Sequence, residues 1–194
     1  MPRLILASTS IYRRDLLARL GLAFDTVSPE VDEAPTPGEH ADTLAARLAR
    51  EKAHAVARRY PEAVVIGSDQ VASLDGEIIG KPGNKVCNIE QLSKASGRTV
   101  TFSTAVAVCQ WGAALERHCV VPFNVHFRPL GRAEIEAYVD REPAFDCAGG
   151  FKAEGLGISL FERLEGEDPT ALIGLPLIAL TTRLRDFGID ALAR

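Results

Sequence analysis

Short runs of wholly apolar residues alternate with longer stretches of helical periodicity along this chain of 194 residues. Residues 4–7 and 63–66 are apolar without interruption, which is typical of strands that are buried on both faces of a sheet. Between them, residues 39–60 carry apolar side chains at helical spacing, and Pro37 and Pro61 mark the beginning and the end of that helix. The alternation predicts an α/β fold.

The second half of the chain predicts antiparallel strands. Asp75-Gly76 is a tight-turn signal between two short strands. Residues 100–108 place larger side chains at every second position, which predicts a half-buried strand, and a turn near 110–113 leads to a partner strand over 120–127. We expect further strands at 24–28 and after 155–161, and further helices at about 10–20, 86–96, 132–140 and from 176 onward.

Composition excludes several classes of protein. Apolar residues make up 46% of the chain and charged residues 25%, which are ordinary values for a globular protein. The formal net charge of −4 argues against a strongly basic nucleic-acid binder, so an anionic ligand needs cations gathered at one place. No apolar run approaches the ~18 residues that cross a membrane, and the four cysteines form no C-x-x-C pair. We therefore expect a cytoplasmic protein with reduced thiols.

One lysine interrupts the apolar face of the predicted helix at residues 39–60. Lys52 is four residues from both Leu48 and Val56, so it lies on the same stripe as those apolar side chains. Two interpretations remain open. The ammonium reaches solvent along its methylene stem, or it points at a bound anion.

Two further polar residues lie where a ligand could bind. Asp69 follows the apolar run at residues 63–66, and ligands of open α/β sheets bind at the carboxyl ends of the strands. An aspartate that only caps a turn is the alternative. Lys81 precedes Pro82, which favours an extended backbone suited to phosphate contact, although a solvated loop lysine is the more common case.

Residues 8–14 (STSIYRR) predict an anion site where a strand leads into a helix. Hydroxyl groups, free backbone N–H groups and the positive end of the helix dipole favour an anion there. Arg13 adds a planar guanidinium that matches phosphate oxygens. Ser8 or Ser10 could instead only cap the helix. However, two adjacent arginines in the first turn oppose the dipole, and an anion would relieve that conflict.

The common phosphate-binding loops are missing from the sequence, since neither G-x-x-x-x-G-K-[ST] nor G-x-G-x-x-G occurs in it. The chain also lacks the H-E-x-x-H and G-x-S-x-G motifs of metalloproteases and hydrolases. Asp32 and Glu33 lie in a proline-rich loop, where they are either solvated or ligands of a metal ion beside a polyphosphate.

Ordered motifs extend along nearly the whole chain. They are 7–14 (ASTSIYRR), 29–33 (PEVDE), 66–71 (IGSDQV), 80–83 (GKPG), 147–149 (CAG), 151–157 (FKAEGLG) and 172–177 (LIGLPL). In order and spacing these motifs resemble the Maf family of nucleotide pyrophosphatases. Tyr12, Gln70 and Glu154 are similar to the branch of that family that acts on 7-methyl-GTP rather than on dTTP and UTP.

The resemblance implies an α/β fold with a mixed central sheet flanked by helices, in two lobes with a deep cleft between them and in a single domain over residues 1–194. It also implies hydrolysis of a nucleoside triphosphate to the monophosphate and pyrophosphate, with a divalent cation (Mg²⁺, Mn²⁺ or Co²⁺) as cofactor. The expected partner is a free nucleotide, with 7-methyl-GTP as the favoured one. Neither a nucleic-acid polymer nor a membrane is expected as partner, and a homodimer is compatible with the resemblance.

The resemblance further implies a role for each matching residue. Asp69 would be the general base, and Glu33 would help to place the metal ion. The residues expected to hold phosphates are Ser8, Arg13, Lys52 and Lys81, and those expected to set the base preference are Tyr12, Gln70 and Glu154. As a hypothesis, Glu154 accepts hydrogen bonds from N1 and N2 of guanine, and Tyr12 offers a π face to a cationic methylated purine.

The chain departs from the family pattern at three positions: Ile11 replaces the usual Pro, Gly150 a frequent Ser and Val86 a common Glu. We expect the first change to loosen the loop at the helix start without removing a contact. If the family's serine contacts substrate, the second change weakens substrate affinity, and no consequence is assigned to Val86. Two other functions remain open. One is the same reaction on dTTP or UTP. The other is a non-catalytic nucleotide sensor that regulates cell division, which would need the cations but not Asp69.

Overall fold

The computed structural model describes residues 2–193 and contains a sheet of seven strands. The strands are β1 (Leu4–Ala7), β2 (Asp25–Thr26), β3 (Val64–Leu74), β4 (Glu77–Ile79), β5 (Thr99–Gln110), β6 (Leu115–Phe127) and β7 (Phe161–Gly166). Their order is β2-β1-β3-β5-β6-β7, with β4 attached to β3. β1 is parallel to both of its neighbours, and the other pairs are antiparallel. The expected mixed α/β sheet is confirmed.

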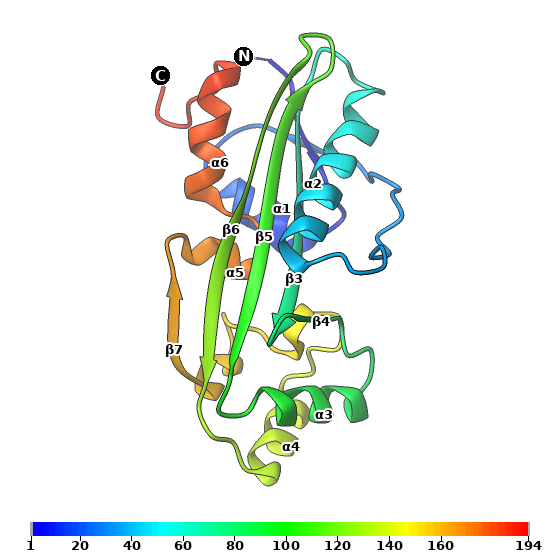
Figure 1. Ribbon diagram of the computed structural model, residues 1–194. Coiled ribbons are helices and arrows are strands. Elements are labelled where there is room, and N and C mark those ends of the chain that lie inside the picture. The colour runs from blue at the N-terminus through cyan, green and yellow to red at the C-terminus, as the bar shows by residue number, and fades with distance from the viewer. Residues whose placement is uncertain (1, 194) are drawn as a thin grey trace.

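Helices surround both halves of this sheet. They are α1 (Ile11–Ala18), α2 (Ala41–Ala57), α3 (Lys85–Ala95), α4 (Arg132–Arg141), α5 (Pro169–Ile173) and α6 (Leu177–Leu184), with short 3-10 turns at Ala148–Gly150, Leu156–Leu160 and Arg185–Phe187. Figure 1 shows the long strands β3, β5 and β6 side by side along the molecule. The helices α1, α2 and α6 surround their upper part, and α3 and α4 lie below.

Three groups of buried apolar side chains hold these layers together. One lies between α2 and the sheet and includes Leu48 and Val65. The second lies on the opposite face, under α1 and α6, and includes Leu17 and Ile66. The third forms the lower lobe and includes Phe127. Because Val65 and Ile66 are consecutive residues of β3, they face opposite cores, which explains why this run is apolar at every position.

β3 is longer than the sequence predicts, and this changes the position of Asp69. The prediction of a strand at 63–66 with Asp69 at its carboxyl end is wrong, because Asp69 lies within β3, opposite Ala105 of β5. The parallel pairing with β1 ends at Gly67, so Asp69 still lies just past the carboxyl end of β1. The small and polar residues 67–70 stay in the strand because their backbone pairs with β5.

The sequence analysis misjudged the burial of β5 and missed the helix α5. β5 is predicted to be half-buried, but residues 102–109 are buried at every position, because α2 and α6 cover its two faces. The short helix α5 was not predicted, since five residues are too few to show a helical period. The tight turn at Asp75-Gly76 is confirmed, with φ angles of 51° and 85° at the two residues.

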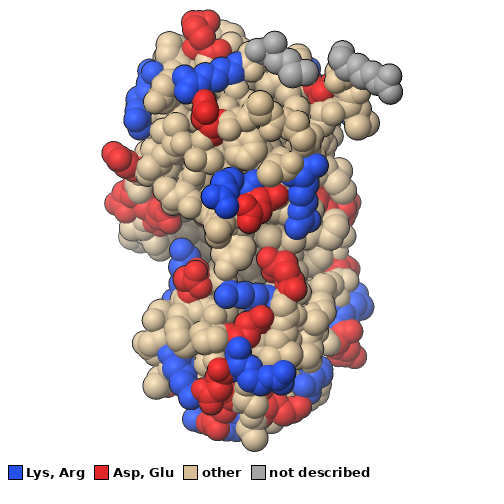
Figure 2. All heavy atoms as spheres, turned by 180° about the vertical axis from the view of Figure 1, so that it is seen from behind, with Lys and Arg blue, Asp and Glu red and all other residues tan. Residues whose placement is uncertain are grey.

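The molecule narrows between its upper and lower halves, and Figure 2 shows the surface hollowed at this waist. The expected pair of lobes is confirmed, and one sheet continues through both of them. A single domain over residues 1–194 stays a prediction. Among the helices within residues 2–193, none combines the length and the apolar character needed to cross a bilayer.

Candidate active site

A cavity of about 720 Å³, here called the large cavity, opens between the two lobes. It is lined by the loop from β1 to α1, the acidic loop after β2, the helix α2, the strand β3, the strand β4 with the segment after it, and the segment 146–148. Eight of the nine predicted site residues lie on its wall, and the ninth, Glu154, lines a neighbouring cavity. The eight are Ser8, Tyr12, Arg13, Glu33, Lys52, Asp69, Gln70 and Lys81.

Lys52 is held between two carboxylates of the large cavity. Its Nζ lies 2.6 Å from Oδ1 of Asp69 and 2.5 Å from Oε1 of Glu33. Lys52 and Asp69 are 5% and 7% exposed, whereas the side chain of Glu33 is 57% exposed. The interpretation that Lys52 reaches solvent is therefore wrong. Its ammonium ends beside a buried carboxylate, and two ion pairs leave one of its three N–H donors for a further acceptor.

A close approach of α2 to β3 brings Lys52 to Asp69. A Cβ atom on Gly67 would lie 2.1 Å from the carbonyl oxygen of Ala49 and 2.6 Å from the backbone nitrogen of Ala53, so only glycine fits there. Gly67 and Asp69 are two residues apart on one strand and face the same side of the sheet. The helix that packs on Gly67 therefore places Lys52 beside Asp69.

The first turn of α1 carries Arg13 at the edge of the large cavity. Oγ of Ser10 accepts a hydrogen bond from the backbone N–H of Arg13, and Oγ of Ser8 accepts one from the backbone N–H of Ser10. The capping interpretation of Ser10 is thus confirmed. Nε of Arg13 donates to the carbonyl oxygen of Gly174 at 2.8 Å. Among the described residues, no hydrogen bond uses the two Nη groups of Arg13, which remain for a ligand.

Charges around the large cavity act on one another. Burial raises the pKa of Glu33, but its hydrogen bond to Lys52 and the charge of Lys81 outweigh this effect, so the pKa lies below its usual value. Burial lowers the pKa of Arg13, and the carboxylates Asp69 and Glu33 oppose that shift. Lys81 is exposed and lines both cavities. Three cations, Arg13, Lys52 and Lys81, and four carboxylates, Glu30, Glu33, Asp69 and Asp146, line the large cavity. A polyanion must therefore bind through direct contact with the cations, and the Nη groups of Arg13 and the exposed Lys81 are placed for such contact.

A second cavity of about 160 Å³, here called the small cavity, adjoins the large one. The two share seven residues on their walls, namely Ser10, Tyr12, Arg13, Gln70, Lys81, Asp146 and Ala148. Glu154 lines only the small cavity. A ligand that spans both cavities would therefore meet Asp69 at one end and Glu154 at the other.

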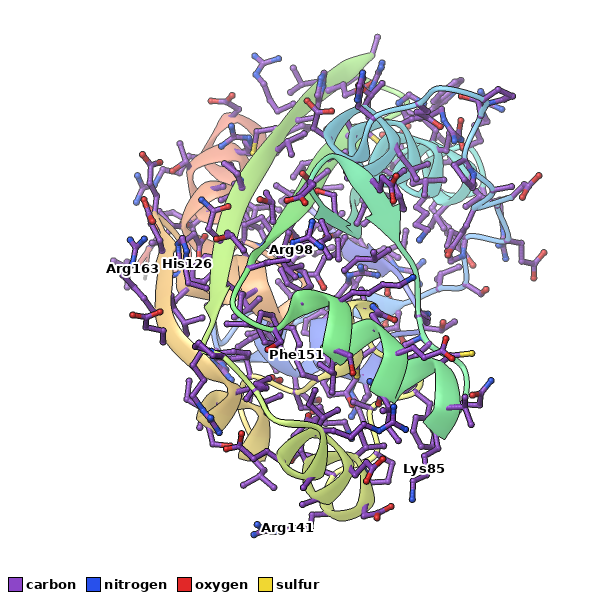
Figure 3. All side chains as sticks on the ribbon, turned by 60° about the horizontal axis from the view of Figure 1, so that its bottom comes forward. Lys85, Arg98, His126, Arg141, Phe151 and Arg163 are labelled. Atoms are coloured by element: carbon purple, nitrogen blue, oxygen red, sulfur yellow. The ribbon has the colours of Figure 1, made fainter. Side chains whose placement is uncertain are left out.

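The loop that carries Glu154 is anchored by Phe151. The Phe151 ring packs edge to face against the rings of Phe102, Phe127 and Phe161, at centroid distances of 5.5, 5.5 and 4.8 Å. Figure 3 shows Phe151 in the interior, behind α3. This packing in the lower core holds the 147–155 segment against the small cavity.

The sequence analysis did not single out two side chains that line the small cavity, Asp146 and Cys147. Burial raises the pKa of Tyr12 to about 12, and the neighbouring Cys147 and Asp146 add to the shift. Burial also raises the pKa of Cys147 to about 11. Both groups are therefore protonated near neutral pH. Cys147 belongs to a motif of the resemblance, but no local pattern marked Asp146.

Gln70 lies on the wall of both cavities, but its N–H groups point away from them. Nε2 donates to the carbonyl oxygens of Ala171 and Leu172 in α5, at 2.8 and 3.0 Å, and lies 3.1 Å from Oγ1 of Thr104. Oε1 of Gln70 has no hydrogen bond to residues 2–193. Gln70 can therefore offer a ligand an acceptor, while its donors hold α5.

The three departures from the family pattern occupy different surroundings. Gly150 has a φ of 74°, and a Cβ atom there would lie 2.3 Å from Nδ2 of Asn88, so a serine would be strained. Gly150 lines neither cavity. Ile11, at the helix start, is 54% exposed and lines the large cavity, whereas the exposed Val86 lines neither.

Comparisons with known proteins agree with this arrangement. A family model described as Maf-like protein matches residues 3–187. The chain belongs to the Maf family. This Maf protein is 60% identical over 188 residues to the 7-methyl-GTP pyrophosphatase of Xanthomonas oryzae pv. oryzae. The aligned residues are 97% of this chain and 98% of that protein. It is 53% identical over 190 residues to the 7-methyl-GTP pyrophosphatase of Pseudomonas aeruginosa, covering 98% and 99% of the two chains.

Solved structures of two other proteins share the fold of this Maf protein at lower sequence identity. A HAM1 protein from Coxiella burnetii aligns with a TM-score of 0.54 at 15% identity, over 96% of this chain and all of that one (100%). The Ham1 protein of Staphylococcus aureus aligns with a TM-score of 0.52 at 14% identity, over 95% and 97% of the two chains. At this identity the likeness concerns the fold alone.

Proposed function

We propose that this Maf protein hydrolyses 7-methyl-GTP to 7-methyl-GMP and pyrophosphate. The observation that carries the proposal is the convergence of one buried carboxylate, Asp69, with three cations on a single cavity that a smaller cavity adjoins. The names of relatives that are 53% and 60% identical over nearly the whole chain support the choice of substrate.

The reaction joins a water oxygen to the α-phosphorus and breaks the bond from that phosphorus to the oxygen that bridges it to the β-phosphate. Asp69 accepts the proton of the attacking water. Lys52 binds Oδ1 of Asp69, which orients the carboxylate and leaves Oδ2 for the water. Negative charge develops on the departing pyrophosphate, and the Nη groups of Arg13 together with the ammonium of Lys81 are placed to neutralise it.

The residues of the large cavity fit a divalent cation only in company with the substrate. Within the described part of the chain, no three His, Cys, Asp or Glu side chains gather closely enough to hold a metal ion by themselves. Mg²⁺ in phosphate-binding sites takes one or two carboxylates and completes its shell with phosphate oxygens and water. Glu33 keeps one oxygen, Oε2, that Lys52 does not contact, and this oxygen would hold the ion, while Oδ2 of Asp69 stays for the water. A bound cation would neutralise phosphate charge and acidify water.

The small cavity is the proposed site of the base. Glu154 offers two carboxylate oxygens to the N1 and N2 donors of guanine. Tyr12 offers the π face of a neutral phenol to a purine that carries a positive charge after methylation at N7. We further propose that the enzyme removes modified nucleotides from the cytoplasm before they enter nucleic acid, and that its substrate is the free nucleotide.

The test is a measurement of pyrophosphate release from 7-methyl-GTP, GTP, dTTP, UTP and CTP with Mn²⁺ or Mg²⁺. We expect the highest kcat/KM for 7-methyl-GTP, and a loss of ~1,000-fold in Asp69→Asn. Asp15→Asn, which changes an exposed aspartate on α1, is the matched control and should keep full activity. A higher kcat/KM for dTTP or UTP would overturn the assignment of 7-methyl-GTP as substrate. Tight nucleotide binding without any pyrophosphate release would favour a sensor.

A further inference from the structure

Three polar side chains of the sheet fasten the segment 171–174, here called the α5 wall, to β3 and β5. Oγ1 of Thr104 donates a hydrogen bond to the carbonyl oxygen of Ala171 at 2.8 Å. Nε2 of Gln70 donates to the carbonyl oxygens of Ala171 and Leu172. Oγ of Ser68 lies 3.1 Å from the carbonyl oxygen of Gly174. The sheet thus holds this segment through the backbone carbonyl oxygens of the segment, in addition to the packing of its side chains.

Thr104, like Ser68, cannot touch a ligand. It is fully buried (0% exposed) and lines neither cavity. It lies directly opposite Gln70 in the pairing of β5 with β3, so the two side chains share one face of the sheet. Its hydroxyl donates to Ala171 and shares an N–H of Gln70, whose Nε2 lies 3.1 Å away, with the carbonyl oxygens of α5. These contacts satisfy a polar group that would otherwise be costly to bury.

The α5 wall connects the two cavities. Leu172, Ile173 and Gly174 line the small cavity, and the carbonyl oxygen of Gly174 accepts the hydrogen bond from Nε of Arg13. Leu172 packs in the lower core, whereas Ile173 packs against the upper one. One short segment therefore forms a side of the small cavity and also orients a cation of the large cavity.

We propose that Thr104 is a positioning residue for base selection: with Gln70 it clamps the α5 wall and so sets the width of the small cavity. This gives the 172–177 motif a role, because its carbonyl oxygens at residues 172 and 174 accept hydrogen bonds from Gln70 and Arg13. This inference rests on the proposed function, since it concerns which nucleotide that reaction accepts. Gln70 contributes to selectivity through the wall that it holds.

The experiment compares Thr104→Val with Thr104→Ser. Valine keeps the shape of the side chain but loses both hydrogen bonds, whereas serine keeps the hydroxyl. We expect Thr104→Val to lower the ratio of kcat/KM for 7-methyl-GTP to that for UTP by ~10-fold, mainly because the methylated nucleotide binds less tightly and its KM rises. Thr104→Ser should keep that ratio within ~2-fold of the wild type. Thr101→Val removes a hydroxyl of the same strand that donates to Asn124, away from α5, and should leave the ratio unchanged.

A double-variant cycle tests the clamp a second time. In Gln70→Glu a carboxylate replaces the amide and can no longer donate to the two carbonyl oxygens of α5. If both residues act through the same wall, Thr104→Val added to Gln70→Glu changes the ratio by less than ~2-fold. Independent, multiplying effects would overturn the proposal.

Two further outcomes separate this inference from the proposed function. An equal loss on both nucleotides in Thr104→Val, accompanied by a lower melting temperature, would show a merely structural role and overturn the inference. If the wild-type protein prefers another nucleotide, the choice of 7-methyl-GTP fails, and the same ratio is then measured with the preferred nucleotide. A fall of that ratio in Thr104→Val still supports the clamp, and an unchanged ratio overturns it.

Discussion

The two adjoining cavities are built in different ways. The large cavity opens between the two lobes, and its central pair, Lys52 and Asp69, is buried and set by the packing of α2 on β3. The small cavity is walled by a loop and by a five-residue helix, and a few side chains hold both in place: Phe151 for the loop, and Gln70 with Thr104 for α5. From this difference we infer that the residues that carry the reaction and those that select the base can be changed independently in this fold. The predictions below test that separation.

Apart from Asp69→Asn, the largest effect is expected from Lys52→Met, which removes the cation that two carboxylates share. Methionine occupies the space of the lysine stem on an apolar stripe, so the fold should persist. Without its partner, the buried Asp69 carboxylate should lower the free energy of unfolding by about 1–3 kcal/mol. We expect kcat to fall ~100-fold for every nucleotide, with unchanged relative preference. Urea unfolding and pyrophosphate release measure the two effects.

A double variant identifies the cause of that destabilisation. Lys52→Met combined with Asp69→Asn removes the unpaired charge, so it should be more stable than Lys52→Met alone and no more active. Equal stability of the single and the double variants would mean that the charge of Asp69 is not the source of the loss. Full activity of Lys52→Met would show that Lys52 takes no part in the reaction.

A smaller and more selective effect is expected from Tyr12→Leu. Loss of the π face should raise the KM for the cationic 7-methyl-GTP by ~10-fold and the KM for GTP by less. Burial raises the pKa of Tyr12 to about 12, so the ring stays neutral in any ordinary assay and no tyrosinate limb should enter the pH profile. Tyr12→Phe keeps the ring and should behave as the wild type. An equal rise of both KM values would argue against recognition of the cation.

The smallest effect concerns the thiol of the small cavity. With a pKa raised to about 11 by burial, Cys147 carries only ~0.1% thiolate at pH 8, and this fraction rises as the pH approaches the raised pKa. Iodoacetamide at pH 8 should therefore label the exposed Cys87 well before Cys147, and bound 7-methyl-GMP should slow the labelling of Cys147 further. Peptide mass spectrometry follows both rates. Equal rates at the two cysteines would contradict the raised pKa and the partial burial of Cys147.

Local patterns in the sequence predicted much of the large cavity. Lys52 stood out as a cation on an apolar helical stripe, and Asp69 as a carboxylate after an apolar run. The structure places both on one wall. Their direct contact could not be predicted, because it depends on the close approach of α2 at Gly67. The position of Asp69 within β3 depends equally on the distant strand β5, whose pairing leaves no local signal.

The small cavity could be predicted less well, because it depends on contacts between residues far apart in the sequence. The donors of Gln70 are directed by carbonyl groups of residues 171 and 172, about a hundred positions later. The helix that carries them is too short to show periodicity. Asp146 follows no pattern of its own, and it lines both cavities on the segment that leads to the anchored Phe151.

The separation of reaction from base choice is tested most directly by one ratio, that of kcat/KM for 7-methyl-GTP to kcat/KM for UTP, in Asp69→Asn and in Glu154→Gln. The account predicts that Asp69→Asn lowers both values ~1,000-fold and keeps the ratio within ~2-fold. Glu154→Gln, which replaces one acceptor oxygen by a donor, should lower the ratio ~10-fold and leave UTP turnover unchanged. A changed ratio in Asp69→Asn, or an equal loss on both nucleotides in Glu154→Gln, would contradict it.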